Sequence, residues 1–255
     1  MHRSLAARRV LLVALSALAA PAGAQAIAGS FSPNPVAPGV PFTLTITDAT
    51  GQGLTLSSPC TWFQIHQGAQ TGPFVSINVA CPAVLVPVPP NGTYAFTWDQ
   101  RDDTGQLVPP GTYWFDAHAW SSGFTTLYRD WFCISIQPPG EPALTAAGAA
   151  HLGQNTPLQI SAPAQANALY IAAASLSSND PITVPGLATC LSAPIFIGPF
   201  TAPVGALDGG GSSNGLELIV PAAPSALWQG LHVQALLLGN NGLALTNDLS
   251  FTVQP

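Results

Sequence analysis

The sequence predicts an all-β protein in which two antiparallel β-sandwich domains follow a cleaved signal peptide in series. Three observations support this prediction. Apolar and polar residues alternate with a period of two in many short runs, as they do in strands that have one face in a core. The 26 prolines and 24 glycines punctuate those runs and disfavour long helices. Near the middle, "IQPPGEPALTAAG" interrupts the alternation and divides the chain in two.

Residues 1–24 have the features of a bacterial secretory signal peptide. A head with three arginines precedes an apolar run, residues 10–20, that is too short to span a bilayer. The small residues that come next are typical of a signal peptidase site and predict cleavage after Ala24 or Ala26. The mature protein is therefore expected to be secreted or to lie in the periplasm or cell envelope, with no integral membrane segment.

The charge of the mature chain excludes several classes of partner. The sequence has 5 basic and 11 acidic residues, and none of the basic residues is a lysine. Three arginines lie in the signal peptide, so the remaining two arginines against 11 acids give a formal charge of −9. This charge excludes a nucleic-acid interface and argues against docking on anionic lipid. With 47% hydrophobic residues, the chain can form large cores.

The first domain is expected over residues 27–137, where six runs carry the alternation. In "PFTLTITD" the apolar Phe42, Leu44 and Ile46 fall on one face and three threonines on the other. In "TYWFDAHAW" the core positions begin with Tyr113 and alternate with polar residues and tryptophans. The other runs are "TWFQIHQ", "FVSINV", "TYAFTW" and "YRDWFCISI". Such runs predict an antiparallel domain with one wet face on each sheet.

A linker is predicted over residues 138–148 and a second sandwich over residues 149–255. The linker contains Pro-Pro-Gly and shows no periodicity. Beyond it, aromatic residues become rare and Ala, Leu, Gly and Pro dominate. Short strands are expected at "PLQISAP", "ALYIAAAS", "PIFIGPF", "LELIVP", "LHVQALLLG" and "LSFTVQP". The segments "LDGGGSSNG" and "GNNG" are typical of turns, because Gly and Asn tolerate positive φ.

The four cysteines lack metal-ligand spacing, and in an exported chain they predict disulfides. Cys60 precedes "TWFQIHQ" and Cys81 follows "FVSINV", so a hairpin of these strands brings the two together. Cys133 points away from the first core, just before the linker, where Cys190 of the second domain can reach it. The pattern favours Cys60–Cys81 and Cys133–Cys190, and the second bridge would fix the domain orientation. Two unpaired thiols are the alternative for Cys133 and Cys190.

Two stretches carry a family resemblance, "PFTLTITDATGQGLTLSSPCTWFQIHQ" and "YAFTWDQRDDTGQLVPPGTYWFDAHA". Residues 30–136 resemble the BsuPI-type intracellular proteinase inhibitor domain, and the last hairpin is also similar to the immunoglobulin-like domain of flagellar hook-capping proteins. The resemblance implies an immunoglobulin-like sandwich and inhibition of serine proteases, but it assigns no inhibitory residue. "LELIVPAAPSALWQGLHVQALLL" and "ALTNDLSFTV" resemble C-terminal β domains of exported proteins of planctomycetes and related bacteria, which implies no particular activity.

The densest group of charges in the sequence is Asp99, Arg101, Asp102 and Asp103. In the family pattern these residues form a turn between two strands, in which Asp accepts backbone N–H bonds and Gly105 takes positive φ. Calcium is the alternative, since Asp99, Asp102 and Asp103 are hard oxygen ligands. The spacing differs from that of an EF-hand loop and lacks the closing Glu. We therefore predict a turn and no metal or other cofactor.

The sequence offers no recognisable catalytic set, and we predict that the protein is not an enzyme. Neither a Ser–His–Asp order nor a G-x-S-x-G motif stands out. His118 and Asp116 are neighbours on one strand face, and we interpret them as part of a polar outer face. The remaining histidines of the mature chain are scattered: His66, His151 and His232.

Three tryptophans of the first domain fall on strand faces away from its core. The alternation places Trp114 and Trp120 opposite the core residues, and Trp131 is out of phase with Phe132. Exposed tryptophans on a sheet can stack on sugars or fill a protein interface. The alternative is that the second domain covers this face. Trp114, Trp120 and Trp131 are the candidate binding face.

These observations lead to three hypotheses about function. The first is a non-catalytic exported β protein, a structural, adhesive or ligand-binding module at or outside the cell envelope, whose partner is an unknown protein or glycan. The first alternative is a secreted serine-protease inhibitor, which follows from the family resemblance. The second alternative is a glycan-binding accessory module, which follows from the tryptophans.

Overall fold

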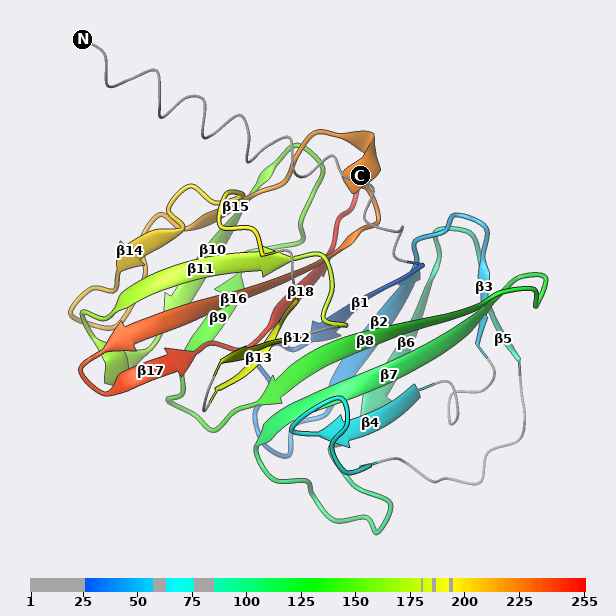
Figure 1. Cartoon of the computed structure of the whole chain (residues 1–255), viewed down its shortest axis with the longest axis horizontal. Coiled ribbons are helices and arrows are strands. Elements are labelled where there is room, and N and C mark those ends of the chain that lie inside the picture. The colour runs from blue at the N-terminus through cyan, green and yellow to red at the C-terminus, as the bar shows by residue number, and fades with distance from the viewer. Residues whose placement is uncertain (1–25, 57–62, 76–84, 180, 185–186, 193–194) are drawn as a thin grey trace.

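The computed structural model describes residues 26–56, 63–75, 85–179, 181–184, 187–192 and 195–255, and this part of the chain is all-β (Figure 1). All pairings between its strands are antiparallel. The helical structure in these ranges is limited to two 3-10 turns, Pro163–Gln165 and Pro224–Ala226. No helix found there is long and apolar enough to cross a membrane. The fold class agrees with the prediction.

The first sandwich is formed by two sheets. One sheet has the order β1–β2–β6, with β1 at Ile27–Ser32, β2 at Phe42–Asp48 and β6 at Thr93–Trp98. In the other sheet, β7 is the long strand that pairs with both β4 and β8. The strands of this sheet are β3 (Leu54–Leu56), β4 (Phe63–Gln67), β5 (Val86–Val88), β7 (Gly111–Ser121) and β8 (Leu127–Ile136).

The core of the first sandwich uses the positions that the alternation predicts. Phe42, Leu44 and Ile46 are buried on the inner face of β2. Tyr113 is buried on β7, and its hydroxyl donates a hydrogen bond of 2.5 Å to the carbonyl of Pro109. This contact resembles the tyrosine corner of immunoglobulin-like sandwiches. Burial raises the pKa of Tyr113 to about 12.

The second sandwich also has two sheets, and a separate two-stranded hairpin, β12–β13, packs against one of them. One sheet has the order β9–β10–β15, with β9 at Ala143–Ala146, β10 at Asn155–Ser161 and β15 at Glu217–Ile219. The other sheet has the order β14–β11–β16–β17, and β18 also pairs with β16. Its strands, and those of the hairpin, are β11 (Leu169–Ser175), β12 (Pro181–Val184), β13 (Leu187–Ser192), β14 (Val204–Ala206), β16 (Gly230–Gly239), β17 (Gly242–Leu245) and β18 (Leu249–Thr252).

The connection between the sandwiches is shorter than the sequence suggests. Strand β8 ends at Ile136, and β9 begins at Ala143. Residues 143–146, which the sequence placed in the linker, pair with β10, and Leu144 is buried in the second core. A strand of four residues with only one large apolar side chain is too short to show a period, which explains the difference.

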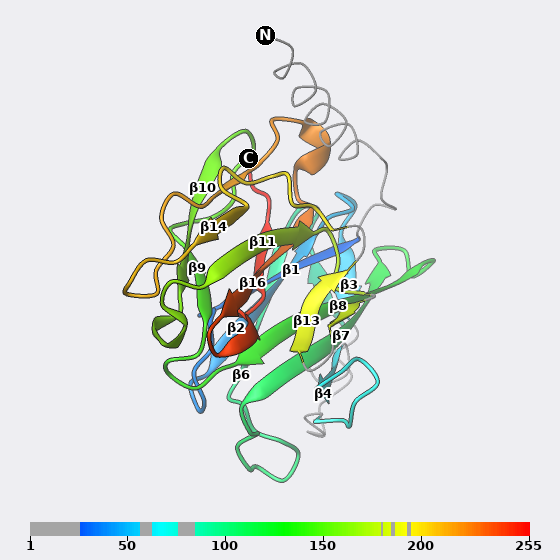
Figure 2. The same cartoon turned by 60° about the vertical axis from the view of Figure 1, so that its left-hand side comes forward.

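The two sandwiches pack against each other along β1. The inner face of β1 joins the first core through Ile27 and Phe31, and Ala28 on its other face is also buried. In Figure 1, β1 (dark blue) lies beside β18 and β16 of the second sandwich. On the inner face of β1, close packing within the first sandwich requires glycine at position 29, because a Cβ there would lie 2.6 Å from the Cε1 atom of Phe132. Figure 2 shows β13 between β16 and β8, where it bridges the two halves.

Candidate functional site

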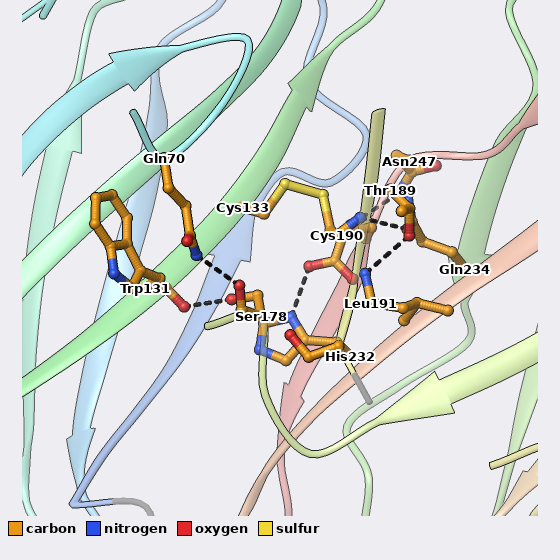
Figure 3. The surroundings of a disulfide bond; sticks show 12 residues. Gln70, Trp131, Cys133, Ser178, Thr189, Cys190, Leu191, His232, Gln234 and Asn247 are labelled. Carbon is orange, nitrogen blue, oxygen red and sulfur yellow. Dashed lines mark hydrogen bonds and ion pairs between the residues drawn. A yellow bond between two sulfur atoms is a disulfide. The ribbon is translucent and has the colours of Figure 1, made fainter. Parts of the chain in front are cut away.

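The candidate site is the junction between the two sandwiches, which is centred on a disulfide (Figure 3). Cys133 on β8 and Cys190 on β13 are bonded, with Cα atoms 5.7 Å apart and a sequence separation of 57. Both side chains are buried. This pair is the one that the strand-face argument predicts. The other predicted pair, Cys60–Cys81, lies outside the described residues.

The structure corrects the candidate binding face of three tryptophans. Trp114 is only 2% exposed and packs against Cys133 and Cys190, so this ring is covered at the junction. Trp131 is partly buried against the same group. Trp120 lies farther along β7, opposite Leu127 of β8. Because the second sandwich covers Trp114, the three rings do not form an open stacking face, and the alternative of a covered face is correct at this position.

One buried amide positions the β13 side of the disulfide. The Oε1 atom of Gln234 on β16 accepts hydrogen bonds from the Cys190 backbone N–H at 2.7 Å and from the Thr189 hydroxyl at 3.1 Å. Its Nε2 atom donates to the carbonyl of Thr246 at 3.1 Å. The Leu191 N–H in turn donates to the Thr189 hydroxyl at 3.0 Å. Gln234 therefore holds β13 against the sheet and fixes the backbone that carries Cys190.

On the other side of the disulfide, polar groups join the loop after β11 to β8 (Figure 3). The Ser178 hydroxyl donates to the Trp131 carbonyl, and the Trp131 N–H donates to the Asn179 side-chain oxygen at 3.0 Å. The Gln70 side-chain amide, from the first sandwich, donates to the Ser178 carbonyl at 2.8 Å. Two of these bonds satisfy the backbone carbonyl and N–H of Trp131 on β8, and the third joins the same loop to the first sandwich.

A second polar contact lies at the far end of the junction, around the buried side chain of Asn247. Its Oδ1 atom accepts from the Leu144 N–H at 2.7 Å. Its Nδ2 atom donates to the Leu144 carbonyl at 3.1 Å and to the Oδ1 atom of Asn34 in the first sandwich at 2.8 Å. Asn34 Nδ2 donates back to the Asp248 carbonyl at 2.6 Å. The Asn34 side chain thus accepts one hydrogen bond from the second sandwich, from Asn247, and donates one to it, to the Asp248 carbonyl.

A buried acid–base pair, His232 and Asp248, lies in the second sandwich near these contacts. His232 Nδ1 is 2.8 Å from Asp248 Oδ2, and both side chains are almost fully buried. Burial alone lowers the pKa of His232, but the negative charges of Asp248 and of Asp130 from β8 raise it above its ordinary value. Burial raises the pKa of Asp248, and His232 opposes this shift. The pKa values of both residues are raised, so the His232–Asp248 pair keeps its proton to a higher pH than the two isolated side chains would.

A second charged group lies on the outer face of β7 and β8. Arg129 donates two hydrogen bonds to the Asp116 carboxylate, at 2.7 and 2.6 Å, and His118 Nε2 lies 3.1 Å from the same carboxylate. Burial raises the pKa of Asp116, but the hydrogen bonds from His118 and Arg129 outweigh it and lower that pKa. The Arg129 guanidinium also lies over the Trp131 ring, 5.2 Å from its centroid. The predicted neighbours Asp116 and His118 therefore belong to a charged cluster in which the Asp116 carboxylate is buried and Arg129 is exposed.

The acidic group at residues 99–103 forms a turn in the structure. Asp102 Oδ1 accepts hydrogen bonds from the Thr104 N–H, the Thr104 hydroxyl and the Gln106 N–H at 2.7 to 2.9 Å. These bonds lower the pKa of Asp102. Asp99 pairs with Arg101 at 3.5 Å, and Gly105 has a φ of 80°. Across the described ranges, no group of three His, Cys, Asp or Glu side chains is arranged to hold a metal ion.

The remaining histidines do not share a site. His66 Nδ1 lies 3.1 Å from the Gly72 carbonyl, and His151 Nδ1 lies 2.8 Å from the Pro255 carbonyl. His232 is buried beside Asp248, so these three histidines each contact a different partner. What the junction can do chemically is hold the two sandwiches in one orientation.

Sequence analysis missed Gln234, Asn247 and Asp248, which organise the junction. Gln234 and His232 are the two polar residues in the apolar run "LHVQALLLG", and a buried polar residue in such a run is a usable signal of a structural hydrogen bond. The "TND" that contains Asn247 and Asp248 has the composition of an exposed turn. The role of Asn247 in joining the sandwiches is visible only from its contact with Asn34, which is 213 positions away in sequence.

Comparisons with known proteins give no family. No family model matches the chain, and the search of curated proteins found no match. Among solved structures, red sea bream transglutaminase matches 90% of this chain and 31% of its own length, at 12% identity and a TM-score of 0.30. Escherichia coli alpha-2-macroglobulin activated by porcine elastase matches 91% of this chain and 22% of its own length, at 12% identity and a TM-score of 0.29. The Pseudomonas aeruginosa CupB2 chaperone matches 83% of this chain and 92% of its own, at 13% identity and a TM-score of 0.28.

The chain therefore spans less than a third of the first two of these proteins. Their activities are not transferred to it.

Proposed function

We propose that the protein is a non-catalytic exported module whose two sandwiches act as one rigid structural unit at or outside the cell envelope. The observation that carries this proposal is the junction. A buried disulfide, the Gln234 amide and the Asn34–Asn247 bonds all constrain the same domain orientation. Two sandwiches joined only by a flexible linker would reorient freely. A pair that reorients freely could not transmit force or present a surface in a fixed direction.

The signal peptide and the disulfide support export, since disulfides persist in oxidising compartments. The test is to express the full chain in a bacterium and to analyse the periplasmic and extracellular fractions by mass spectrometry. We expect an N-terminus at Gln25 or Ile27 and an intact Cys133–Cys190 bridge. Recovery of the uncleaved chain with reduced thiols from the cytoplasm alone would overturn the proposal of an exported module.

The protease-inhibitor alternative depends on the family resemblance of residues 30–136 alone, and the glycan alternative loses Trp114, which is buried. Titration of the purified protein against subtilisin-like and trypsin-like proteases separates the structural proposal from the protease-inhibitor alternative. We expect the proteases to retain full activity at a molar excess of the protein. Stoichiometric inhibition would overturn the structural proposal and support the function of a protease inhibitor.

A further inference from the structure

The outer face of the sheet β14–β11–β16–β17 has two halves of opposite character. One half is polar and buried: Ser175, His232 and Gln234 lie under β13 and the first sandwich. The other half is aliphatic and exposed, although aliphatic side chains are the ones that a protein normally buries. In Figure 1 this half lies at the left, in front of β9 and β10, and no labelled element covers it.

The exposed half is a continuous patch because the strand register places its side chains in two adjacent rows. In one row, Ile171 of β11 lies opposite Val204 of β14 and Leu236 of β16. In the next row, Leu238 of β16 lies between Leu169 of β11 and Leu243 of β17. We call these six residues the aliphatic face. Five of them are strongly exposed: Val204 by 61%, Leu238 by 56%, Leu169 by 55%, Leu243 by 50% and Ile171 by 40%.

The aliphatic face carries no charge. Strands β11, β14, β16 and β17 contain no Asp, Glu, Lys or Arg, although the mature chain has a net negative charge. Anionic lipid would require cations, and a sugar would require aromatic rings to stack on. The outward side chains of these strands offer neither. The chemistry that fits the face is therefore another uncharged aliphatic sheet.

We propose that this occupant is the aliphatic face of a second copy of the chain, in an isologous two-fold dimer. A second copy brings aliphatic side chains and no charge to the contact, so the negative chains do not repel each other there. The two sheets would stack in the way that sheets stack inside a sandwich. The dimer extends a surface that already works as an interface, since β13 docks on the adjoining half of the same face.

The area of the aliphatic face suits a weak, reversible dimer. Its exposed side chains present on the order of 400 Å² of apolar surface, which matches the largest patch on a typical monomer. Together with the margins of the sheet, two copies would bury on the order of 1,000 Å², the low end of specific interfaces. We therefore expect a dissociation constant in the micromolar range.

Sedimentation velocity and light scattering of the mature protein, over a concentration series, test this proposal. We expect a dimer whose dissociation constant rises at least about a hundredfold in Leu238→Arg, because the contact would bury an unpaired charge. Leu127→Arg is the matched control, since Leu127 is 50% exposed on β8 of the first sandwich. Its dissociation constant is expected to stay within about twofold of the wild type. Val204→Arg, at the opposite edge of the face, provides a second variant if Leu238→Arg fails to fold.

A wild-type protein that stays monomeric at about 200 μM would overturn the proposal, since that concentration is far above the expected dissociation constant. A dimer that both face variants leave intact would also overturn it. The same proteins are mixed with phosphatidylcholine vesicles and with soluble polysaccharides. Monomeric wild-type protein whose binding to either is lost in Leu238→Arg would assign the face to that occupant and not to a second copy. None of these outcomes depends on export or on the rigid junction, so this inference and the proposed function can fail separately.

Discussion

Cys133 and Cys190 belong to different sandwiches, yet their Cα atoms lie 5.7 Å apart in a buried disulfide that spans 57 residues of sequence. Trp114 packs over this bridge, and Gln234 holds the backbone of Cys190. A covalent bond, an aromatic ring and a buried amide therefore constrain one point of contact between the domains. This combination fixes the orientation of the two sandwiches at the junction.

The double variant Cys133→Ser with Cys190→Ser is expected to lose about 2–4 kcal/mol of unfolding free energy, because the bridge closes a long loop in the unfolded chain. Urea denaturation of the oxidised proteins measures this loss. Non-reducing peptide mapping of the wild type is expected to recover Cys133 linked to Cys190. Free thiols at both positions, or a loss below about 1 kcal/mol, would contradict the prediction.

The fold class and the bridge could be predicted because they depend on a local signal, the period-two alternation. Phe132 and Cys133 are adjacent on one strand, so they must face opposite sides of the sheet. Phe132 joins the first core and Cys133 faces the second sandwich. Because Cys133 faces away from the first core, its disulfide partner had to lie outside that core. The same alternation placed Tyr113 in the first core.

What covers a strand face could not be predicted, because alternation distinguishes two faces without showing what each one meets. Trp114 lies on a strand face away from the core of the first sandwich, and Leu169 and Ile171 lie on a face away from the core of the second. The second sandwich buries Trp114, while Leu169 and Ile171 remain exposed. The Asn34–Asn247 contact was also inaccessible, since no local pattern relates residues 213 positions apart.

Asn247→Ala is expected to destabilise the protein by about 2–4 kcal/mol, because it removes the partner of several buried groups at once. Among them are the Leu144 N–H and the Asn34 side-chain oxygen. Asn155→Ala is the control, since the Asn155 side chain makes an exposed hydrogen bond to Glu217 and is expected to cost less than about 0.5 kcal/mol. Urea denaturation of both variants is the measurement. Equal losses in the two variants would show that Asn247 has no special role at the junction.

The free energy of unfolding is expected to decrease as pH rises above neutrality because of His232 and Asp248. The pKa of His232 is raised above 6.5 and the pKa of Asp248 above 3.8, so the folded state binds more protons than the unfolded state. The contribution of His232 is fully present below pH 6.5 and is lost as pH rises through its folded pKa. One extra proton corresponds to a slope of at most about 1.4 kcal/mol per pH unit.

Urea denaturation between about pH 5.5 and 9 measures this slope. Asp248→Asn removes the carboxylate that holds the proton on His232, so it is expected to flatten the slope. His151→Gln is the control, because the His151 side chain lies outside the buried pair, with its Nδ1 atom 2.8 Å from the main-chain oxygen of Pro255. It should keep the wild-type slope. A slope that persists in Asp248→Asn would exclude the buried pair as its origin.

At the acid end, Asp116 is expected to dominate the pH dependence of stability. Its pKa is lowered below 3.8 in the folded state, so its stabilising contribution is present above pH 3.8 and is lost as pH falls through the folded value. Asp116→Asn is expected to cost about 1–3 kcal/mol at neutral pH, because it removes the negative charge and one of the two oxygens that accept hydrogen bonds from Arg129. It should also make the acid side of the stability profile shallower. Asp99→Asn, in an exposed pair with Arg101, is the control and should leave both properties unchanged.

The acidic turn is expected to hold its shape without a metal ion. Asp102 already accepts three hydrogen bonds from Thr104 and Gln106, which supply the role that a cation would otherwise fill. Addition of EDTA, or of millimolar calcium, should therefore leave the melting temperature of the wild type unchanged in a calorimetric scan. Asp102→Ala should lower the melting temperature slightly in both conditions, because the lost bonds belong to the turn. A melting temperature that falls with EDTA and recovers with calcium, in the wild type but not in Asp102→Ala, would establish a calcium site at Asp102.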